Sequence, residues 1–255
     1  MGTDAALSTE NSDSPNSKPI DWPPALGRLL LGAVVGSVLG WLTLSVTYPI
    51  FVVPPEIAIL PDPPPKASVE KLEAALFVVN SKNFAISFSL IGLLIGVTSA
   101  FFTYGFRYPG RIVCSGLLGA IFCVIGILIC NVFITRARAS GGNDIILLGI
   151  TLDDLKQTIL SQACMWGLTG LGIGLGLGRN LKTSIVAGIS GLVGGALAAM
   201  LYGVGMAVIA PNAGTFLPFP EAKFDRAIWM VFAAAIIALT IGMGTGERAK
   251  KAKPA

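Results

Sequence analysis

The sequence predicts an all-α integral membrane protein with six transmembrane helices. Its 255 residues are 53% apolar and only 13% charged, with a mean hydropathy of +0.76, whereas soluble domains carry about a quarter charged residues. The apolar residues are also gathered in six blocks, each close to the ~20 residues that a helix needs to cross the hydrocarbon core of a bilayer. The bilayer is therefore the expected solvent and partner of this chain.

The six blocks are continuous apolar runs without the alternation of a barrel strand, so each is expected to be a helix that satisfies its own backbone groups. They cover approximately Leu26–Thr47, Phe84–Tyr104, Ile112–Ile134, Thr158–Leu177, Ser184–Ile209 and Ala227–Gly244. Residues 1–24 are polar and predict a disordered tail. Residues 248–255 form a basic C-terminal tail, which leaves a six-span membrane domain over residues 25–247.

The connections between the spans alternate in length. Short basic turns at Arg107–Arg111 and Arg179–Lys182 join the second span to the third and the fourth to the fifth. The other three connections are long, and an amphipathic helical pattern begins near the end of each, at Ser68, Thr151 and Pro220. These residue types suit a helix start, with Ser68 and Thr151 as N-caps and Pro220 in a first turn. We therefore expect an amphipathic connector helix in each of the three long connections.

Basic residues at the start of the odd-numbered spans recur regularly. Arg111 follows Arg28 by 83 residues, and Lys182 follows Arg111 by 71, nearly the spacing of the three connector patterns. We infer three repeated hairpins, over about residues 26–107, 108–179 and 180–248. Each has two spans, so the repeats would share one orientation around an axis along the membrane normal. This layout resembles that of the mitochondrial carriers, although the proline-acid-basic signature that closes their odd helices is absent.

Small residues at every fourth position are the strongest local signal, because such stripes let helix backbones approach closely in lipid. The candidate packing positions are Gly32, Gly36, Gly40, Gly92, Gly96, Gly170, Gly174, Gly178, Gly191, Gly195 and Gly203. We expect them to pack helices within the fold or between subunits. A glycine-lined pore or a gating helix is the alternative, and the fourth span, with six glycines from Gly167 to Gly178, is the best candidate for a hinge.

Residues that carry chemistry are scarce. The chain has no histidine and no cluster of Cys, Asp or Glu at ligand spacing, so we expect no metal and no cofactor. Its four cysteines lie in apolar spans, where no disulfide framework is expected. Arg28 is the only basic residue within the predicted spans, and intramembrane charge usually marks transport or catalysis. We therefore expect that the protein is not an enzyme.

Two functions stay open at this point. The leading hypothesis is a non-enzymatic, glycine-packed helical bundle that acts as a scaffold or as an accessory subunit for other membrane subunits. The alternative is a small-solute channel or carrier with a path between the three repeats, lined by Asn131, Gln162 and Thr169. Hydrogen bonds between helices are the simpler role for these three side chains.

Lysines and arginines near the span ends predict the orientation. Ten lie on the side of the termini and the short turns and eight on the other side, where Arg136 and Arg138 oppose the trend. We place both termini in the cytoplasm and the chain in the cytoplasmic (inner) membrane. The basic tail is expected to meet anionic lipid headgroups. Aromatic residues mostly near the predicted span ends are expected to anchor at the interface: Trp22, Trp41, Trp166 and Trp229, with Tyr48, Tyr104 and Tyr108. The basic residues follow no aromatic-studded surface, so no nucleic acid is expected as a partner.

Overall fold

The computed structural model describes the backbone of residues 22–59, 61, 65–140, 146–147, 150–209, 220 and 222–251. Within these ranges it describes the side chains of residues 26–59, 61, 65–130, 155–209, 220 and 222–246. The described part of the chain is helical apart from its turns and loops and one antiparallel pairing of two short strands, β1 (Ile146–Leu147) and β2 (Ile150–Thr151).

Six long helices build the molecule. They are α1 (Trp22–Thr47), α3 (Lys66–Tyr104), α4 (Pro109–Ser140), α5 (Leu152–Leu177), α6 (Leu181–Ile209) and α7 (Lys223–Lys251). Each contains a stretch that is long enough and apolar enough to cross a membrane. The prediction of six membrane-spanning helices is therefore confirmed at the level of helix length and composition.

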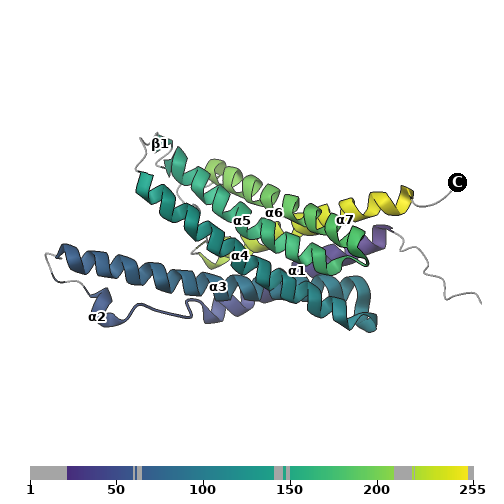
Figure 1. The fold of residues 1–255 in the computed structure, drawn as a ribbon, viewed down its shortest axis with the longest axis horizontal. Coiled ribbons are helices and arrows are strands. Elements are labelled where there is room, and N and C mark those ends of the chain that lie inside the picture. Colours follow the sequence, from purple (N-terminus) through teal and green to yellow (C-terminus); the bar gives the residue numbers. More distant parts are fainter. Residues whose placement is uncertain are drawn as a thin grey trace, which may run out of the picture.

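The six helices form a closed ring in sequence order. Each long helix packs against the next one along the chain, and α7 packs against α1 to close the ring. Smaller contacts join α3 to α5 and α5 to α7. Figure 1 shows the long helices lying side by side, with α3 extending well beyond the others at one end. The second, fourth and sixth spans therefore face the middle of the bundle.

α3 differs most from the sequence expectation. The connector expected from Ser68 and the span expected from Phe84 are one continuous helix of 39 residues, which begins after Pro65. At 1.5 Å per residue this helix is ~58 Å long, about twice the thickness of the hydrocarbon core. The prediction of a separate connector helix is wrong here, because neither Gly nor Pro interrupts the chain between the two patterns.

The other two connector patterns also open span helices and form no separate helix in the described residues. Thr151 lies in β2 directly before α5. α7 begins at Lys223, so Pro220 precedes the helix and does not occupy its first turn. The first connection instead holds a short helix of four residues, α2 (Pro55–Ala58).

The long helices at the two ends of the chain exceed the predicted spans. α1 begins at Trp22, inside the region predicted as a tail, with Pro23 and Pro24 in its first turn, where a missing N–H costs no hydrogen bond. α7 continues to Lys251, so the first residues of the basic tail are helical. The rest of both predicted tails lies outside the described residues.

Local capping explains the two short turns. Gly105 caps the end of α3: it has φ +61° and donates its N–H to the carbonyl of Phe101, and only glycine takes this conformation without strain. A single turn of 3-10 helix, η1 (Gly105–Arg107), leads to α4. Before α6, Asn180 Oδ1 accepts the N–H of Thr183 (2.9 Å) and Thr183 Oγ1 accepts the N–H of Asn180 (3.0 Å). This reciprocal pair is a capping box.

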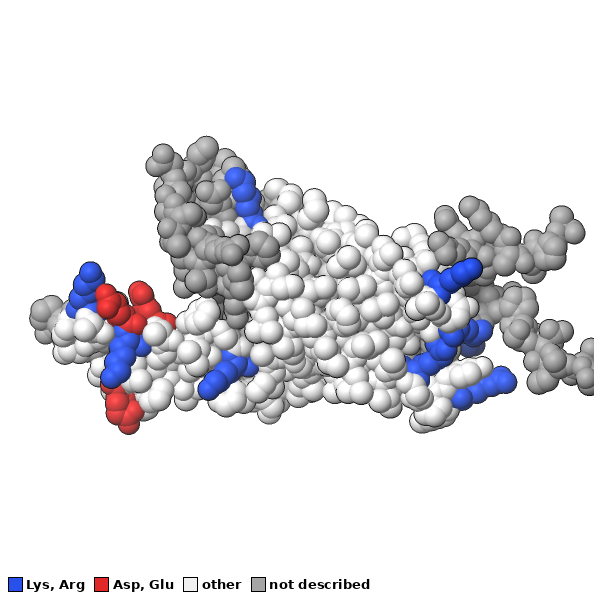
Figure 2. Space-filling view, in the orientation of Figure 1, with Lys and Arg blue, Asp and Glu red and all other residues white. Residues whose placement is uncertain are grey.

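Charged side chains gather at the two ends of the bundle. We call the end with α2 and the start of α3 the long-loop end, and the end with η1 and Asn180 the short-turn end. Figure 2 shows lysines, arginines and acidic residues at the long-loop end, only lysines and arginines at the short-turn end, and an uncharged band between them. Such a band is what a protein surrounded by hydrocarbon presents to the lipid.

Candidate functional site

The candidate site is the middle of the ring, where α3, α5 and α7 each contribute one aromatic side chain. Phe88, Trp166 and Trp229 contact one another edge to face, with ring centroids 6.3 Å (Phe88 to Trp166), 5.5 Å (Phe88 to Trp229) and 4.9 Å (Trp166 to Trp229) apart. We call them the central aromatic cluster. Each is only 1% exposed. Edge-to-face pairs stabilise by about 0.5–1.5 kcal/mol beyond their burial, so the cluster holds the three helices together.

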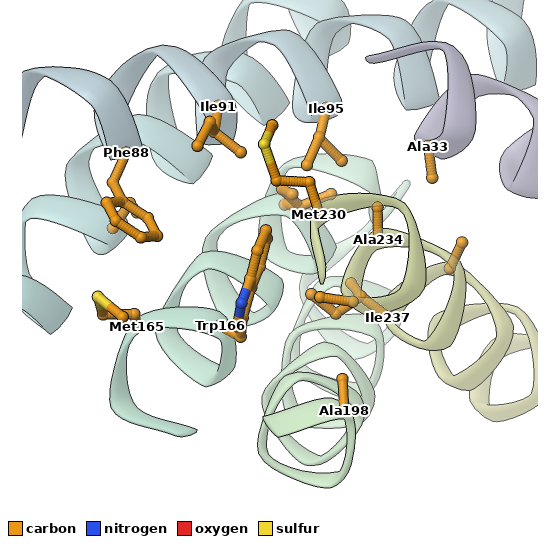
Figure 3. Packing of buried hydrophobic residues seen from close by; sticks show 14 of the residues in the cluster. Ala33, Phe88, Ile91, Ile95, Met165, Trp166, Ala198, Met230, Ala234 and Ile237 are labelled. Atoms are coloured by element: carbon orange, nitrogen blue, oxygen red, sulfur yellow. The ribbon is translucent and has the colours of Figure 1, made fainter. Parts of the chain in front are cut away.

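Aliphatic side chains fill the space around the cluster. In Figure 3 the Trp166 side chain of α5 lies among Met165 of the same helix, Met230 and Ile237 of α7, and Ile91 and Ile95 of α3. These five side chains are at most 2% exposed and belong to the same core as the aromatic cluster. The middle of the described ring is therefore packed with apolar side-chain atoms.

The expectation that Trp166 and Trp229 anchor the protein at the membrane interface is wrong. Both lie inside the bundle, where each is 1% exposed. Each precedes a small residue by one helical turn: Trp166 precedes Gly170, and Trp229 precedes Ala233. Phe88 precedes Gly92 in the same way. This aromatic-x-x-x-small pattern in the second, fourth and sixth spans is the sequence signal from which the cluster could have been found.

The predicted polar path is only partly within the described side chains. Gln162 is fully buried, and neither its Oε1 nor its Nε2 has a hydrogen-bond partner among the described residues. Thr169 is also fully buried, but its hydroxyl donates to the carbonyl of Met165 (2.7 Å) one turn earlier in α5. The side chain of Asn131 lies outside the described residues. Other buried polar atoms without a partner are the hydroxyls of Ser87 and Tyr202 and the indole N–H of Trp166.

Two further buried polar residues, which the sequence did not single out, fasten the long-loop end. The Asn83 amide exchanges two hydrogen bonds with the backbone of Phe51, each 2.8 Å long. Arg226 is 3% exposed, donates from Nε to the carbonyl of Pro220 (3.1 Å), and lies 4.7 Å above the ring of Tyr48. Arg226 was missed because the predicted sixth span began one residue after it.

The glycines of α1 lie where α1 crosses its neighbours. A Cβ on Gly32 would lie 2.7 Å from the carbonyl oxygen of Thr98, and a Cβ on Gly36 would overlap the same residue's hydroxyl. The Thr98 hydroxyl donates to the carbonyl of Gly32 (2.7 Å). Gly40, one turn further, faces the Met230 side chain of α7 at 3.1 Å. The backbones of α1 and α3 are therefore in direct contact.

Gly92 and Gly96 of α3 face α4. A Cβ on Gly92 would lie 2.6 Å from the carbonyl oxygen of Gly119, and a Cβ on Gly96 would overlap the carbonyl of Ser115. Such distances are shorter than real Cβ contacts allow, so a side chain at either position would push the two backbones apart.

Glycines of α5 and α6 meet each other. A Cβ on Gly170 would overlap the backbone of Gly191, and the reverse is also true; one turn away, a Cβ on Gly174 would overlap the carbonyl of Ala187. Gly195 of α6 faces the carbonyl of Trp166. This crossing therefore lies directly beside the central aromatic cluster.

The last two predicted packing glycines have different surroundings. A Cβ on Gly178, at the end of α5, would overlap the backbone of Ser184 at the start of α6. Gly203 faces only the side chain of Ile159, at 2.6 Å. At Gly203, as at Gly40, the close contacts are with side chains, which can rotate away, so a larger residue costs least at these two positions.

Known proteins give no further guide to this site. Among the described residues, no group of three or more His, Cys, Asp or Glu side chains is placed to hold a metal ion. Comparison of the chain with protein-family models, with curated proteins and with solved structures found no match.

Proposed function

We propose that this protein is a non-enzymatic membrane protein, a tightly packed helical bundle that serves as a scaffold or accessory subunit. The observation that carries the proposal is the closed centre. Three aromatic rings from three spans fill it, and the aliphatic side chains around them are buried as well. A solute path through the middle of the bundle would require these side chains to move apart.

We also propose that the bundle consists of three repeated hairpins. Two helix crossings support this, because their contacting residues are separated by constant intervals in the sequence. The α3–α4 crossing pairs Gly92 with Gly119, and the α5–α6 crossing pairs Gly170 with Gly191. Gly170 follows Gly92 by 78 residues, the same interval that separates Trp166 from Phe88. Gly191 follows Gly119 by 72 residues, and the neighbouring pairs, Gly96 with Ser115 and Gly174 with Ala187, repeat with both intervals.

A role as an accessory subunit requires a surface for another protein, and the projecting half of α3 offers one. Leu76, Phe77 and Val78 are 41–49% exposed. They lie on the part of α3 that also carries Glu70, Lys71, Glu73 and Lys82, and charges of this kind keep a helix out of the hydrocarbon core. Large apolar side chains exposed outside the lipid favour contact with another protein.

For the orientation, we propose that both termini and the short-turn end face the cytoplasm. Arg28, Arg107, Arg111, Arg179 and Lys182 lie at this end, and the acidic side chains that the structure describes lie at the other. Positive residues near span ends favour the cytoplasmic side, which is consistent with insertion in a cytoplasmic (inner) membrane.

The closed centre is tested by measuring how fast solutes and ions cross a membrane that contains the protein. Purified protein reconstituted in liposomes is expected to pass glycerol, urea, K⁺ and protons no faster than empty liposomes do, with gramicidin as the positive control for cations. A flux well above that of empty liposomes, proportional to the amount of protein, would remove the scaffold proposal.

The role as an accessory subunit is tested by measuring the size of the complex that contains the protein, in mild detergent extracts of the native membrane. The wild-type protein is expected in a complex larger than its own mass, and Leu76→Ser/Phe77→Ser is expected to release it. Lys71→Gln/Glu73→Gln, which changes charges on the same projecting segment, is the matched control and should leave the complex intact. If the wild-type protein is extracted alone, this part of the proposal is wrong.

A small-solute carrier is the second candidate, and one observation favours it. The buried amide of Gln162 has no hydrogen bond among the described residues, which destabilises the folded state by about 1–3 kcal/mol. Hydrogen bonds to a bound polar solute would offset this loss of stability. If any of the fluxes above exceeds that of empty liposomes, Gln162→Met should abolish it; a flux that survives this substitution would exclude Gln162 from the path.

A further inference from the structure

The short-turn end carries a cluster of cationic and aromatic side chains from three helices. Tyr104 is the last residue of α3, Arg111 lies in the first turns of α4, and Arg179 follows the end of α5. The hydroxyl of Tyr104 donates to the carbonyl of Leu177, and Nη2 of Arg111 donates to the carbonyl of Arg179 (2.7 Å). These bonds fix the cluster to the C-terminal end of α5.

Both guanidinium groups lie against the same aromatic ring. Their central carbons are 5.9 Å (Arg111) and 5.6 Å (Arg179) from the centroid of Tyr104, within the range of cation–π attraction. Tyr108 packs edge to face on Tyr104. The central guanidinium carbon of Arg107 lies 5.9 Å from the centroid of the Tyr108 ring. Two like charges are thus held beside one ring although they repel each other.

Local roles account for only part of this arrangement. A cation near the C-terminus of a helix interacts favourably with the helix dipole, which explains why Arg111 donates to the carbonyl of Arg179, just after the end of α5. Each guanidinium, however, has five N–H donors, and all four acidic side chains that the structure describes, those of Glu56, Glu70, Glu73 and Asp225, lie at the long-loop end. The described residues therefore supply no carboxylate to balance Arg111 and Arg179.

The position of the cluster indicates which anion would balance it. The apolar span of α5 ends at Leu177 and that of α4 begins at Pro109, so the guanidinium groups lie where the hydrocarbon core gives way to headgroups. Phe106, Val113 and Leu181 are 83%, 56% and 77% exposed nearby. A positive site bordered by exposed apolar side chains suits an amphiphile: a phosphate on the guanidinium groups, and acyl chains along the helices.

We propose that Tyr104, Arg111 and Arg179 form a binding site for the phosphate group of an anionic phospholipid. The guanidinium forks of the two arginines bind phosphate oxygens, and the Tyr104 ring keeps both forks in place. This site is separate from the basic C-terminal tail, and it holds whether the bundle is a scaffold or a carrier.

The test compares lipid binding by the full-length protein in detergent. Titration with fluorescent phosphatidylglycerol is expected to show saturable binding, and the double substitution Arg111→Gln/Arg179→Gln is expected to weaken it roughly 30-fold, the ratio that corresponds to ~1 kcal/mol for each arginine. Lys71→Gln/Lys82→Gln removes two charges from the long-loop end and is the matched control, expected to change the affinity less than twofold. Equal losses in both double variants would overturn the proposal, because they indicate unspecific charge attraction.

Further measurements control for misfolding of the double variant and distinguish a lipid phosphate from free inorganic phosphate. Arg179→Gln serves as the test if the double variant fails to fold, because this single substitution removes no backbone hydrogen bond found in this structure. It is expected to weaken lipid binding about fivefold. Arg111→Lys/Arg179→Lys keeps the charge but loses the planar forks and should bind more weakly than wild type. Phosphatidylcholine binding as tightly as phosphatidylglycerol, or millimolar inorganic phosphate displacing the lipid completely, would overturn the assignment to an anionic lipid.

Discussion

Asn83 and Gln162 are both buried amides, but they differ in their hydrogen bonds. Asn83 is bonded to the backbone at Ile50 and Phe51, and so ties the loop after α1 to α3. In the part of the chain that the structure describes, neither polar atom of the Gln162 amide has a hydrogen-bond partner. A hydrogen-bonded buried amide stabilises the folded state, whereas an unpaired one destabilises it by the desolvation that it suffers.

This contrast leads to a paired prediction. Asn83→Leu should destabilise the protein by about 1–3 kcal/mol, because two backbone N–H groups lose their acceptor. Gln162→Met, of similar shape, should leave the stability unchanged or raise it. Thermal unfolding in detergent, followed by circular dichroism, measures both. A loss of stability in Gln162→Met as large as that in Asn83→Leu would mean that this amide is hydrogen bonded in the membrane.

The glycines of α6 allow a second test at the residue scale. Gly191 faces the backbone of Gly170, whereas Gly205, in the same helix, has no other atom within 4 Å of a Cβ built on it. Gly191→Ala is therefore expected to destabilise the bundle by about 1–3 kcal/mol through overpacking. Gly205→Ala is the control and should be neutral or slightly stabilising, because alanine favours helix. Equal melting temperatures for the two variants would contradict direct backbone contact at Gly191.

At the scale of the elements, α3 determines the shape of the long-loop end. Its 39 residues exceed what the bilayer needs, so residues 66–82 project with their charged side chains. Neighbouring helices are held by backbone contacts at small residues, and the two short turns are closed by Gly105 and by the capping box of Asn180 and Thr183. Each helix therefore has little freedom to slide along its neighbour.

The projection of α3 gives a topology prediction. In a variant whose four cysteines are replaced by serine or alanine, a cysteine at Phe77 and a cysteine at Leu181 should react with a membrane-impermeant maleimide from opposite sides of the membrane. With the short-turn end in the cytoplasm, Phe77→Cys should react in intact cells and Leu181→Cys only after permeabilisation. Labelling of both from the same side would contradict the six-span arrangement, and the reversed pattern would reverse the orientation.

Much of the helical framework could be predicted from the sequence, because apolar length alone limits a helix in lipid. The first helix, α1, ends at the predicted residue, Thr47. The continuity of α3 was missed, because amphipathic and apolar patterns were read as separate elements although nothing breaks the helix between them. The central aromatic cluster was missed because tryptophans in spans were interpreted as interfacial anchors. Only the packing of three helices distinguishes Trp166 and Trp229 from Trp41, which donates its N–H to the carbonyl of Lys223.

At the scale of the whole molecule, the closed ring and the filled centre belong together. Helices in lipid gain little from apolar burial and associate through close packing. Here small residues bring neighbouring backbones together around the ring, while the central aromatic cluster fills the space that six helices leave between them. The charged ends then fix the bundle across the bilayer (Figure 2). Because we propose that the centre is closed, we also propose that partners and lipids bind at the outer surfaces.

An experimental structure of the protein in lipid nanodiscs tests this most directly. We predict continuous side-chain density joining Phe88, Trp166 and Trp229 across the middle of the ring, with no ordered water between the long-loop end and the short-turn end. A water-filled path along the centre, with these three rings turned aside, would contradict the closed bundle and favour the carrier.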